Sequence, residues 1–111
     1  MIFVYGPLGS GKTAAAAQIL GCAEAELEGR CLWDVQDLAA EETDLEALAA
    51  RLSVHEVLIA TEQGAGVIPA DPETRRAREA AGRFCCLLAA RAEAVYRVCC
   101  GIPLCLKGEE R

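Results

Sequence analysis

The sequence predicts an α/β fold in which a mostly parallel sheet carries helices on both faces. Short apolar runs without alternation, such as 1–5 and 57–60, indicate strands that are buried on both sides. Segments with helical periodicity separate these runs, as in successive βα units with right-handed crossovers. A glycine-rich segment at 6–13 joins the first strand to the first helix. The chain has 111 residues, and we expect residues 1–111 to form a single domain.

The first half of the chain is expected to contain two strands and two helices. Residues 1–5 form the first strand, and the alanine-rich segment 13–23 forms a helix that can pack closely on the sheet. The apolar run within 30–36 predicts the second strand. Residues 41–52 predict an amphipathic helix, because leucine and alanine recur there at spacings of three and four. Thr43 is the expected N-cap if that helix begins later.

The second half predicts three strands and one long helix. Residues 56–61 form a buried strand, and 71–92 form the longest helix, with Asp71 as its N-cap and a proline in the first turn. Residues 94–100 form the last central strand. A turn then leads into a short edge strand within 101–107. We expect a sheet of reduced size.

The glycine-rich segment has the spacing Gly-x4-Gly-Lys-Thr of a phosphate-binding loop, and it stands between a strand and a helix as that loop requires. Its glycines are expected to adopt positive φ, so that successive N–H groups face an anion. The lysine serves the outer phosphates, the threonine hydroxyl ligates Mg²⁺, and the helix points its positive end at the same site. This segment predicts a P-loop NTPase-like protein. The predicted nucleotide-binding residues are Gly6, Gly9, Ser10, Gly11, Lys12 and Thr13.

Asp34 ends the apolar run of the second predicted strand and is similar in position to the carboxylate of a Walker B strand. Such a carboxylate lies near the Mg²⁺ ion of the bound nucleotide. We therefore interpret Thr13 and Asp34 as the metal ligands, with Mg²⁺ and ATP or GTP as the cofactors. Asp37 in the same role, or a surface position for Asp34, are the alternatives.

Glu62 stands at the tip of the strand 56–61, and the loop 62–69 follows it. Open α/β sheets bind ligands at the carboxyl ends of their strands, so this loop is a candidate binding loop. The long helix carries the one basic cluster of the chain. It consists of Arg75, Arg76, Arg78 and Arg83. We expect a solvated helix face, with a contact to a substrate phosphate or a neighbouring subunit as the alternative.

Seven cysteines are present, and none of them has the Cys-x-x-Cys spacing of a metal or redox site. We expect reduced thiols that serve as small buried hydrophobic side chains. A metal or redox site built from Cys85–Cys86 and Cys99–Cys100 is the alternative. His55 is the single histidine, and we expect a solvated or capping role for it at a strand edge.

The net charge of −6 argues against a nucleic-acid backbone as the main partner. No run approaches the roughly 18 apolar residues that indicate a membrane span. The amino terminus lacks the basic and apolar regions of a signal peptide, so the expected location is the cytoplasm.

The second half of the chain contains further distinctive motifs. Residues 60–69 include Glu-x-Gly-x-Gly-x-x-Pro, and 101–107 read Gly-Ile-Pro-Leu-Cys-Leu-Lys, with matching stretches at 75–83 and 92–95 between them. Together with the phosphate-binding loop, they resemble the bifunctional adenosylcobinamide kinase/adenosylcobinamide-phosphate guanylyltransferase family of cobalamin biosynthesis.

The resemblance implies a RecA-like or kinase-like P-loop sheet, adenosylcobinamide as the acceptor, and assembly into homo-oligomers. In that family the aminopropanol hydroxyl is phosphorylated, and GMP is then transferred to the phosphate through a guanylyl-histidine. Carried onto this chain, the resemblance implies that Lys12 and Thr13 serve the triphosphate and Mg²⁺, and that Glu62 lies in the active-site loop. Lys12 and Glu62 are therefore the catalytic candidates.

The family segment that carries the guanylylated histidine is missing between the first helix and Asp34, and His55 does not align with it. We therefore predict a shortened member that acts as an adenosylcobinamide kinase, and guanylyl transfer is not expected of it. The alternatives are a catalytically reduced nucleotide-binding or regulatory homologue, and a P-loop kinase for another small molecule.

Overall fold

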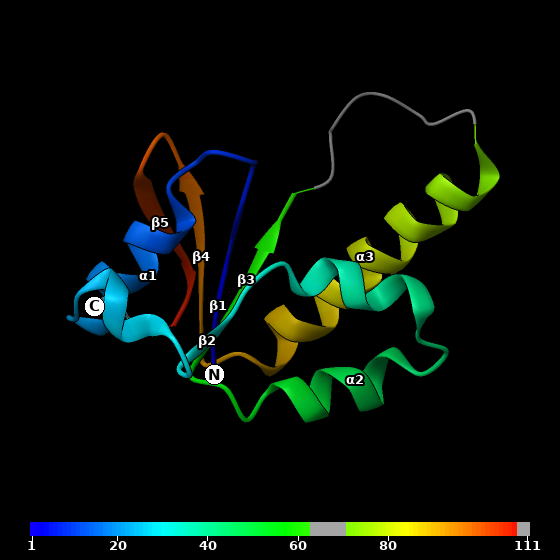
Figure 1. Ribbon diagram of the computed structural model, residues 1–111. Coiled ribbons are helices and arrows are strands. Elements are labelled where there is room, and N and C mark those ends of the chain that lie inside the picture. The colour runs from blue at the N-terminus through cyan, green and yellow to red at the C-terminus, as the bar shows by residue number, and fades with distance from the viewer. Residues whose placement is uncertain (63–70, 109–111) are drawn as a thin grey trace.

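The computed structural model describes residues 1–62 and 71–108. In this part of the chain, five strands form one sheet in the order β2-β3-β1-β4-β5 (Figure 1). The first four strands are parallel, and β5 is antiparallel to β4, so the predicted α/β fold with a mostly parallel sheet is confirmed. The strands are β1 (Ile2–Gly6), β2 (Cys31–Leu32), β3 (Val57–Thr61), β4 (Ala94–Cys99) and β5 (Ile102–Lys107). The helices are α1 (Lys12–Leu20), α2 (Leu45–Leu52) and α3 (Pro72–Arg91), with the 3-10 helices η1 (Glu24–Leu27) and η2 (Val35–Glu41).

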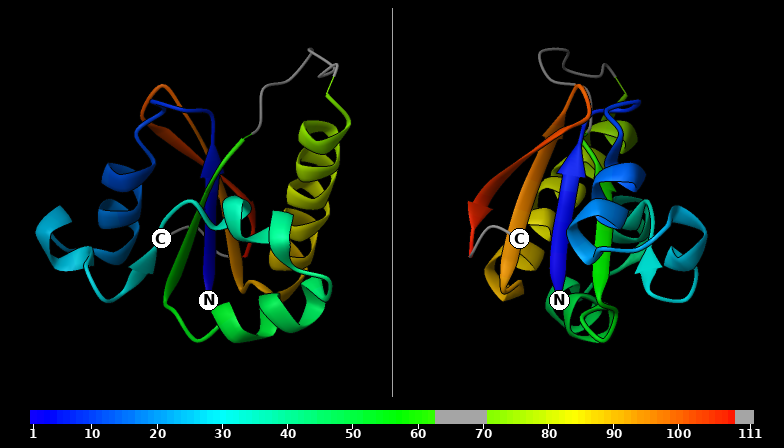
Figure 2. Two further views of the ribbon diagram at one scale, coloured as in Figure 1. Left: turned by 45° about the vertical axis from the view of Figure 1, so that its right-hand side comes forward. Right: turned by 90° about the vertical axis from the view of Figure 1, so that its left-hand side faces the viewer.

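Helices cover both faces of the sheet, as the two views of Figure 2 show. On one face, the small side chains of α1 pack with Ile2 and Val4 of β1. On the other face, η2, α2 and α3 form a second core, in which Phe84 of α3 packs with Phe3 and Leu58. Successive residues of β1 therefore point into two different cores, which explains the continuous apolar run in its sequence.

The central position of β1 determines where the candidate site lies. β1 pairs with β3 on one side and with β4 on the other. Its last residue, Gly6, is in register with Thr61 at the end of β3. Because these strands are parallel, the loop after β1 and the residues after β3 lie together at the carboxyl edge of the sheet.

The second strand is much shorter than the predicted range 30–36, since β2 comprises two residues. Asp34 adopts a left-handed conformation with φ of 54°, which ends the strand and turns the chain into η2. Val35 and Gln36 are buried in η2 rather than in the sheet. The apolar run therefore predicted burial correctly but overestimated the length of the strand.

The helix ends follow their capping residues. α2 begins after Asp44, whose carboxylate accepts a hydrogen bond from the Ala47 N–H at 3.1 Å, so the predicted cap Thr43 is wrong. Gly21 ends α1 in a left-handed conformation, two residues before the predicted end. Asp71 is confirmed as the N-cap of α3. Most of the loop predicted at 62–69 lies outside the described residues.

The cysteines are less buried than predicted. Cys31 is buried, whereas Cys86 and Cys100 are exposed and the other four are partly buried. Cys22, Cys85 and Cys105 still pack against the two cores. The expectation of small buried side chains is therefore wrong for the exposed Cys86 and Cys100 and holds only in part for the four partly buried ones. None of the described helices combines the length and the apolarity that crossing a bilayer requires.

Candidate functional site

The segment 6–13 comprises the end of β1, a loop at 7–11 and the start of α1, at the carboxyl edge of the sheet (Figure 1). Gly9 and Gly11 adopt left-handed angles as predicted, with φ of 74° and 89°. Gly6 does not, so the prediction of positive φ is wrong for this residue. A Cβ on Gly6 would overlap the carbonyl oxygen of Val98 in β4, so Gly6 is needed for the close approach of two backbones.

The two side chains predicted to serve the triphosphate both make contacts beside this loop. Lys12 Nζ donates a hydrogen bond to the carbonyl oxygen of Pro7 at 2.8 Å, which holds the ammonium group over the loop. Thr13 Oγ1 accepts a hydrogen bond from the indole Nε1 of Trp33 at 3.1 Å. Sequence reasoning did not single out Trp33, because its proximity to Thr13 depends on the path of the chain after β2.

Ser10 takes a different place from the other predicted loop residues. It is only 5% exposed, and its hydroxyl has no hydrogen-bond partner among the residues that the structure describes. Its carbonyl oxygen accepts a hydrogen bond from the N–H of Gly101 at 2.7 Å, which ties the loop to the turn after β4. The side chain of Ser10 therefore points into the protein, and a contact with phosphate would have to come from its backbone.

A groove of about 290 Å³ runs along the loop, and Asp34 lies in it. The groove is lined by Gly9, Gly11, Lys12, Thr13, Ala14, Glu24, Trp33, Asp34 and Ile59. Asp34 Oδ1 accepts a hydrogen bond from Thr61 Oγ1 at 3.1 Å, which orients the carboxylate. Asp37 does not line the groove. The geometry thus favours Asp34 over Asp37 for the predicted metal role.

The oxygen donors of this groove suit a magnesium–nucleotide complex. Thr13 offers a hydroxyl and Asp34 a carboxylate, and Mg²⁺ usually takes one or two protein oxygens besides phosphates and water. Within residues 1–62 and 71–108, no three His, Cys, Asp or Glu side chains are grouped so that they could hold a metal ion by themselves. The residues present therefore fit an ion that arrives with the triphosphate.

Glu62, directly after β3, is held by an arginine that sequence reasoning missed. Arg97 Nε and one terminal nitrogen donate to the two carboxylate oxygens of Glu62 at 2.6 and 3.0 Å. The hydrogen bond to Glu62 raises the pKa of Arg97. The Glu62 N–H donates to the carbonyl oxygen of Gly6 at 2.9 Å, so this residue adjoins the phosphate-binding loop. The signal for Arg97 was available, because it is the one charged residue within an apolar strand.

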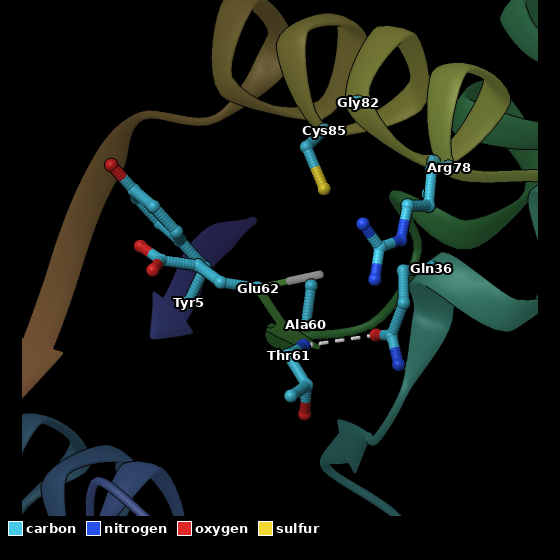
Figure 3. Close-up of a pocket in the computed structure, with 9 residues that line it drawn as sticks. Tyr5, Gln36, Ala60, Thr61, Glu62, Arg78, Gly82 and Cys85 are labelled. Atoms are coloured by element: carbon cyan, nitrogen blue, oxygen red, sulfur yellow. Dashed lines mark hydrogen bonds between the residues drawn. The ribbon is translucent and has the colours of Figure 1, made fainter. Parts of the chain in front are cut away.

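A cavity of about 420 Å³ lies on the α3 side of the sheet, with Glu62 in its wall (Figure 3). It is lined by Tyr5, Gln36, Ala60, Thr61, Glu62, Arg78, Ala81, Gly82 and Cys85. Figure 3 shows that Cys85 and Arg78 extend from α3 toward the ends of β1 and β3. Burial raises the pKa of the Cys85 thiol to about 11, so this side chain is an uncharged part of the wall. Burial and then the charge of Glu62 raise the pKa of Tyr5.

The basic cluster divides between two environments. Arg78 lines the cavity, whereas Arg75, Arg76 and Arg83 are exposed on α3. The exposure of these three residues agrees with a solvated face, and the alternative contact to a substrate phosphate or a neighbouring subunit stays a prediction.

His55 lies at the opposite edge of the sheet from the phosphate-binding loop, in the turn between α2 and the start of β3. Its Nδ1 is 3.0 Å from the carbonyl oxygen of Leu52 near the end of α2. This contact agrees with the predicted capping role. No element of the described chain brings His55 to the groove.

The sheet, the loop after β1 and the groove beside it define an α/β protein of the P-loop NTPase-like class. The family model described as cobinamide kinase/cobinamide phosphate guanyltransferase matches residues 22–106, and the chain belongs to this family. Membership supports a role in cobalamin biosynthesis, in a family of kinases and transferases that act on cobinamide and nucleoside triphosphates. The match begins after residues 6–13, so the Gly-x4-Gly-Lys-Thr motif is an independent observation. A comparison with curated proteins gives no match.

Proposed function

We propose that the protein binds ATP or GTP with Mg²⁺ at residues 6–13 and phosphorylates the aminopropanol hydroxyl of adenosylcobinamide. The observation that carries this proposal is the groove in which Lys12, Thr13 and Asp34 come together within a chain of the cobinamide kinase family. Phosphoryl transfer depends mainly on positioning and charge stabilisation, so a loop, a cation site and an acceptor group suffice.

Each candidate residue has a distinct task in the proposed reaction. The loop N–H groups and Lys12 bind the phosphates, which requires Lys12 to exchange its contact with Pro7 for a phosphate oxygen. Thr13 and Asp34 hold Mg²⁺, which neutralises charge on the outer phosphates. The acceptor oxygen bonds to the γ-phosphorus, and the bond from that phosphorus to the bridging oxygen breaks. The nucleoside diphosphate then leaves, and the acceptor proton passes to the Glu62 carboxylate.

Guanylyl transfer through a histidine is not part of the proposal. His55 lies at the amino edge of the sheet, whereas the nucleotide groove lies at the carboxyl edge. After incubation with labelled GTP, His55 should carry no acid-labile GMP. A labelled His55 would contradict this part of the proposal.

The Lys12→Ala variant tests the kinase proposal. Adenosylcobinamide should stimulate Mg²⁺-dependent nucleotide turnover by the wild-type protein, and the variant should lose at least a hundredfold in kcat/KM, because a phosphate-neutralising charge is removed. Nucleotide binding without turnover would favour the catalytically reduced homologue. Turnover with another alcohol and none with cobinamide would favour a different small-molecule kinase.

We also propose that the protein forms homo-oligomers. The edge strand β5 supports this, because Ile102, Leu104 and Leu106 are 69%, 61% and 52% exposed. Sedimentation equilibrium should give a mass above 11.8 kDa, and a strictly monomeric mass would contradict the proposal.

A further inference from the structure

We propose that the cavity between α3 and the ends of β1 and β3 is the acceptor site, and that it takes a short aliphatic arm ending in an alcohol. This inference rests on the proposed kinase function and assigns a place to its second substrate. It makes Gly82 the residue that keeps the site open.

The position of the cavity relative to the nucleotide groove supports the assignment. Thr61 separates the two: its hydroxyl donates to Asp34 on the groove side, and its N–H donates to Gln36 Oε1 at 2.9 Å on the cavity side. Glu62, in the cavity wall, is bonded through its N–H to Gly6 at the start of the phosphate-binding loop. A hydroxyl held at Glu62 is therefore adjacent to the loop that holds the phosphates.

The chemistry of the wall defines the class of ligand. Ala60, Ala81 and the uncharged thiol of Cys85 provide an apolar surface, suited to the carbon atoms of a short aliphatic chain. Tyr5, Gln36 and Arg78 add polar groups to the same wall. The carboxylate of Glu62 offers a hydrogen-bond acceptor for a hydroxyl, and Arg97 fixes its orientation through two hydrogen bonds. An alcohol on a short carbon chain matches the apolar surface and the Glu62 carboxylate.

The volume limits how much of the substrate enters. At about 420 Å³ the cavity lies near the lower end of the roughly 300–1,000 Å³ that small-molecule pockets occupy. The aminopropanol arm of a cobinamide fits this space, whereas the much larger corrin ring has to remain outside.

Gly82 gives an independent reason to regard this space as functional. It is an exposed residue within the 20-residue helix α3, where glycine is less favourable than alanine. A Cβ at this position would meet no heavy atom within 4 Å, so the packing of the protein itself does not require glycine there. Since Gly82 lines the cavity, we infer that the missing side chain leaves room for the acceptor.

The experiment introduces side chains at Gly82 that should occupy part of the cavity. Gly82→Ala and Gly82→Leu are compared with wild type and with Ala90→Leu, a matched control at another exposed position of the same helix that does not line the cavity. Equilibrium dialysis measures the Kd for adenosylcobinamide, and a separate titration measures the Kd for GTP with Mg²⁺.

Gly82→Leu should weaken cobinamide binding at least tenfold and leave GTP binding within twofold, while Ala90→Leu should change neither value. Gly82→Ala should give a smaller loss with no decrease in thermal stability, which keeps the test valid if the leucine variant folds poorly. Free aminopropanol should compete weakly with cobinamide for the wild-type protein.

The outcomes separate this inference from the proposed function. If wild type binds cobinamide and both Gly82 variants bind it equally well, the cavity assignment is overturned and the kinase proposal stands. If the variants lose GTP and cobinamide binding to the same extent, the cavity is not a separate acceptor site. If wild type binds no cobinamide, both proposals fail.

Discussion

At the scale of single residues, the hydrogen bond between Trp33 and Thr13 links the candidate metal ligand to the one tryptophan of the chain. The Thr13 oxygen accepts the indole N–H at 3.1 Å, and the indole is 38% exposed. A cation bound at the same oxygen would alter this contact, because the ion and the indole N–H would then share the two lone pairs of one hydroxyl. Binding of Mg²⁺ with the nucleotide in the groove should therefore change the environment of Trp33.

We predict that GTP with Mg²⁺ changes the intrinsic fluorescence of the protein, and that GTP with excess chelator gives a clearly smaller change. With selective excitation of tryptophan the signal belongs to Trp33 alone, since no other tryptophan is present. Thr13→Val removes the shared oxygen and should abolish the Mg²⁺-dependent part. An equal change with and without Mg²⁺ would speak against Thr13 as a metal ligand.

The glycines of the loop make a second prediction at this scale, because they are needed for different reasons. Gly6 has no space for a Cβ beside the Val98 carbonyl, and Gly9 has space but a φ of 74°. Gly6→Ala should lower the free energy of unfolding by about 1–3 kcal/mol through overpacking. Gly9→Ala should cost about 1–2 kcal/mol through backbone strain alone. Denaturant unfolding measures both, and crystallography of Gly6→Ala should show β1 and β4 moved apart.

At the scale of elements, α3 carries most of the cavity wall and begins at a well-defined cap. Asp71 accepts hydrogen bonds from the N–H groups of Glu73 and Thr74 and from the Thr74 hydroxyl, the last at 2.8 Å. The Thr74 hydroxyl, followed by the Glu73 N–H, lowers the pKa of Asp71. The start of this helix is therefore coupled to the charge of one carboxylate.

The sign of this coupling gives a pH prediction. Because the pKa of Asp71 is lower in the folded state, its contribution to stability is present above the unfolded pKa of about 3.9 and is lost as the pH falls through the folded value. Asp71→Ala should lower the unfolding midpoint at neutral pH, and the difference from wild type should shrink in acid. Thermal unfolding at several pH values checks this. A difference that stays constant down to low pH would exclude the charge as the cause.

The helices and strands also show how much of the fold and of the candidate site could be predicted from the sequence. The central strands were predictable because β1 and β3 are apolar throughout, and α3 because its cap and apolar spacing agree. The early end of β2 was not predictable, because nothing in the sequence around Asp34 shows that this residue adopts a left-handed conformation and ends the strand. The phosphate-binding loop was visible as a motif. The cavity was not, because Gln36 and Gly82 meet only when η2 and α3 pack on the same face of the sheet.

At the scale of the whole molecule, the sheet separates the two candidate sites. The groove adjoins α1 on one face, and the cavity adjoins α3 on the other. β1 and β3 lie between them, and the two spaces come close only at the carboxyl edge. Each ligand should therefore stabilise the folded protein without needing the other.

We predict that GTP with Mg²⁺ at a hundredfold excess over its Kd stabilises the protein by about 2.7 kcal/mol, which raises the unfolding midpoint by roughly 10 °C. Adenosylcobinamide should add its own increase when both are present. Thermal scans with each ligand and with the pair measure this, with Lys12→Ala as the control that keeps only the cobinamide effect. If cobinamide raised the unfolding midpoint only after the nucleotide had bound, the prediction of two independent sites would be contradicted.

The hydrogen bond from Glu62 to Gly6 has a consequence for the order of events in turnover. It holds Glu62 beside the loop after β1, so we expect that neither substrate has to assemble the site for the other. The groove and the cavity lie on opposite faces of the sheet, so we expect that neither substrate blocks the other's path. Steady-state kinetics should therefore follow a random sequential scheme, with intersecting double-reciprocal lines and no obligatory first substrate.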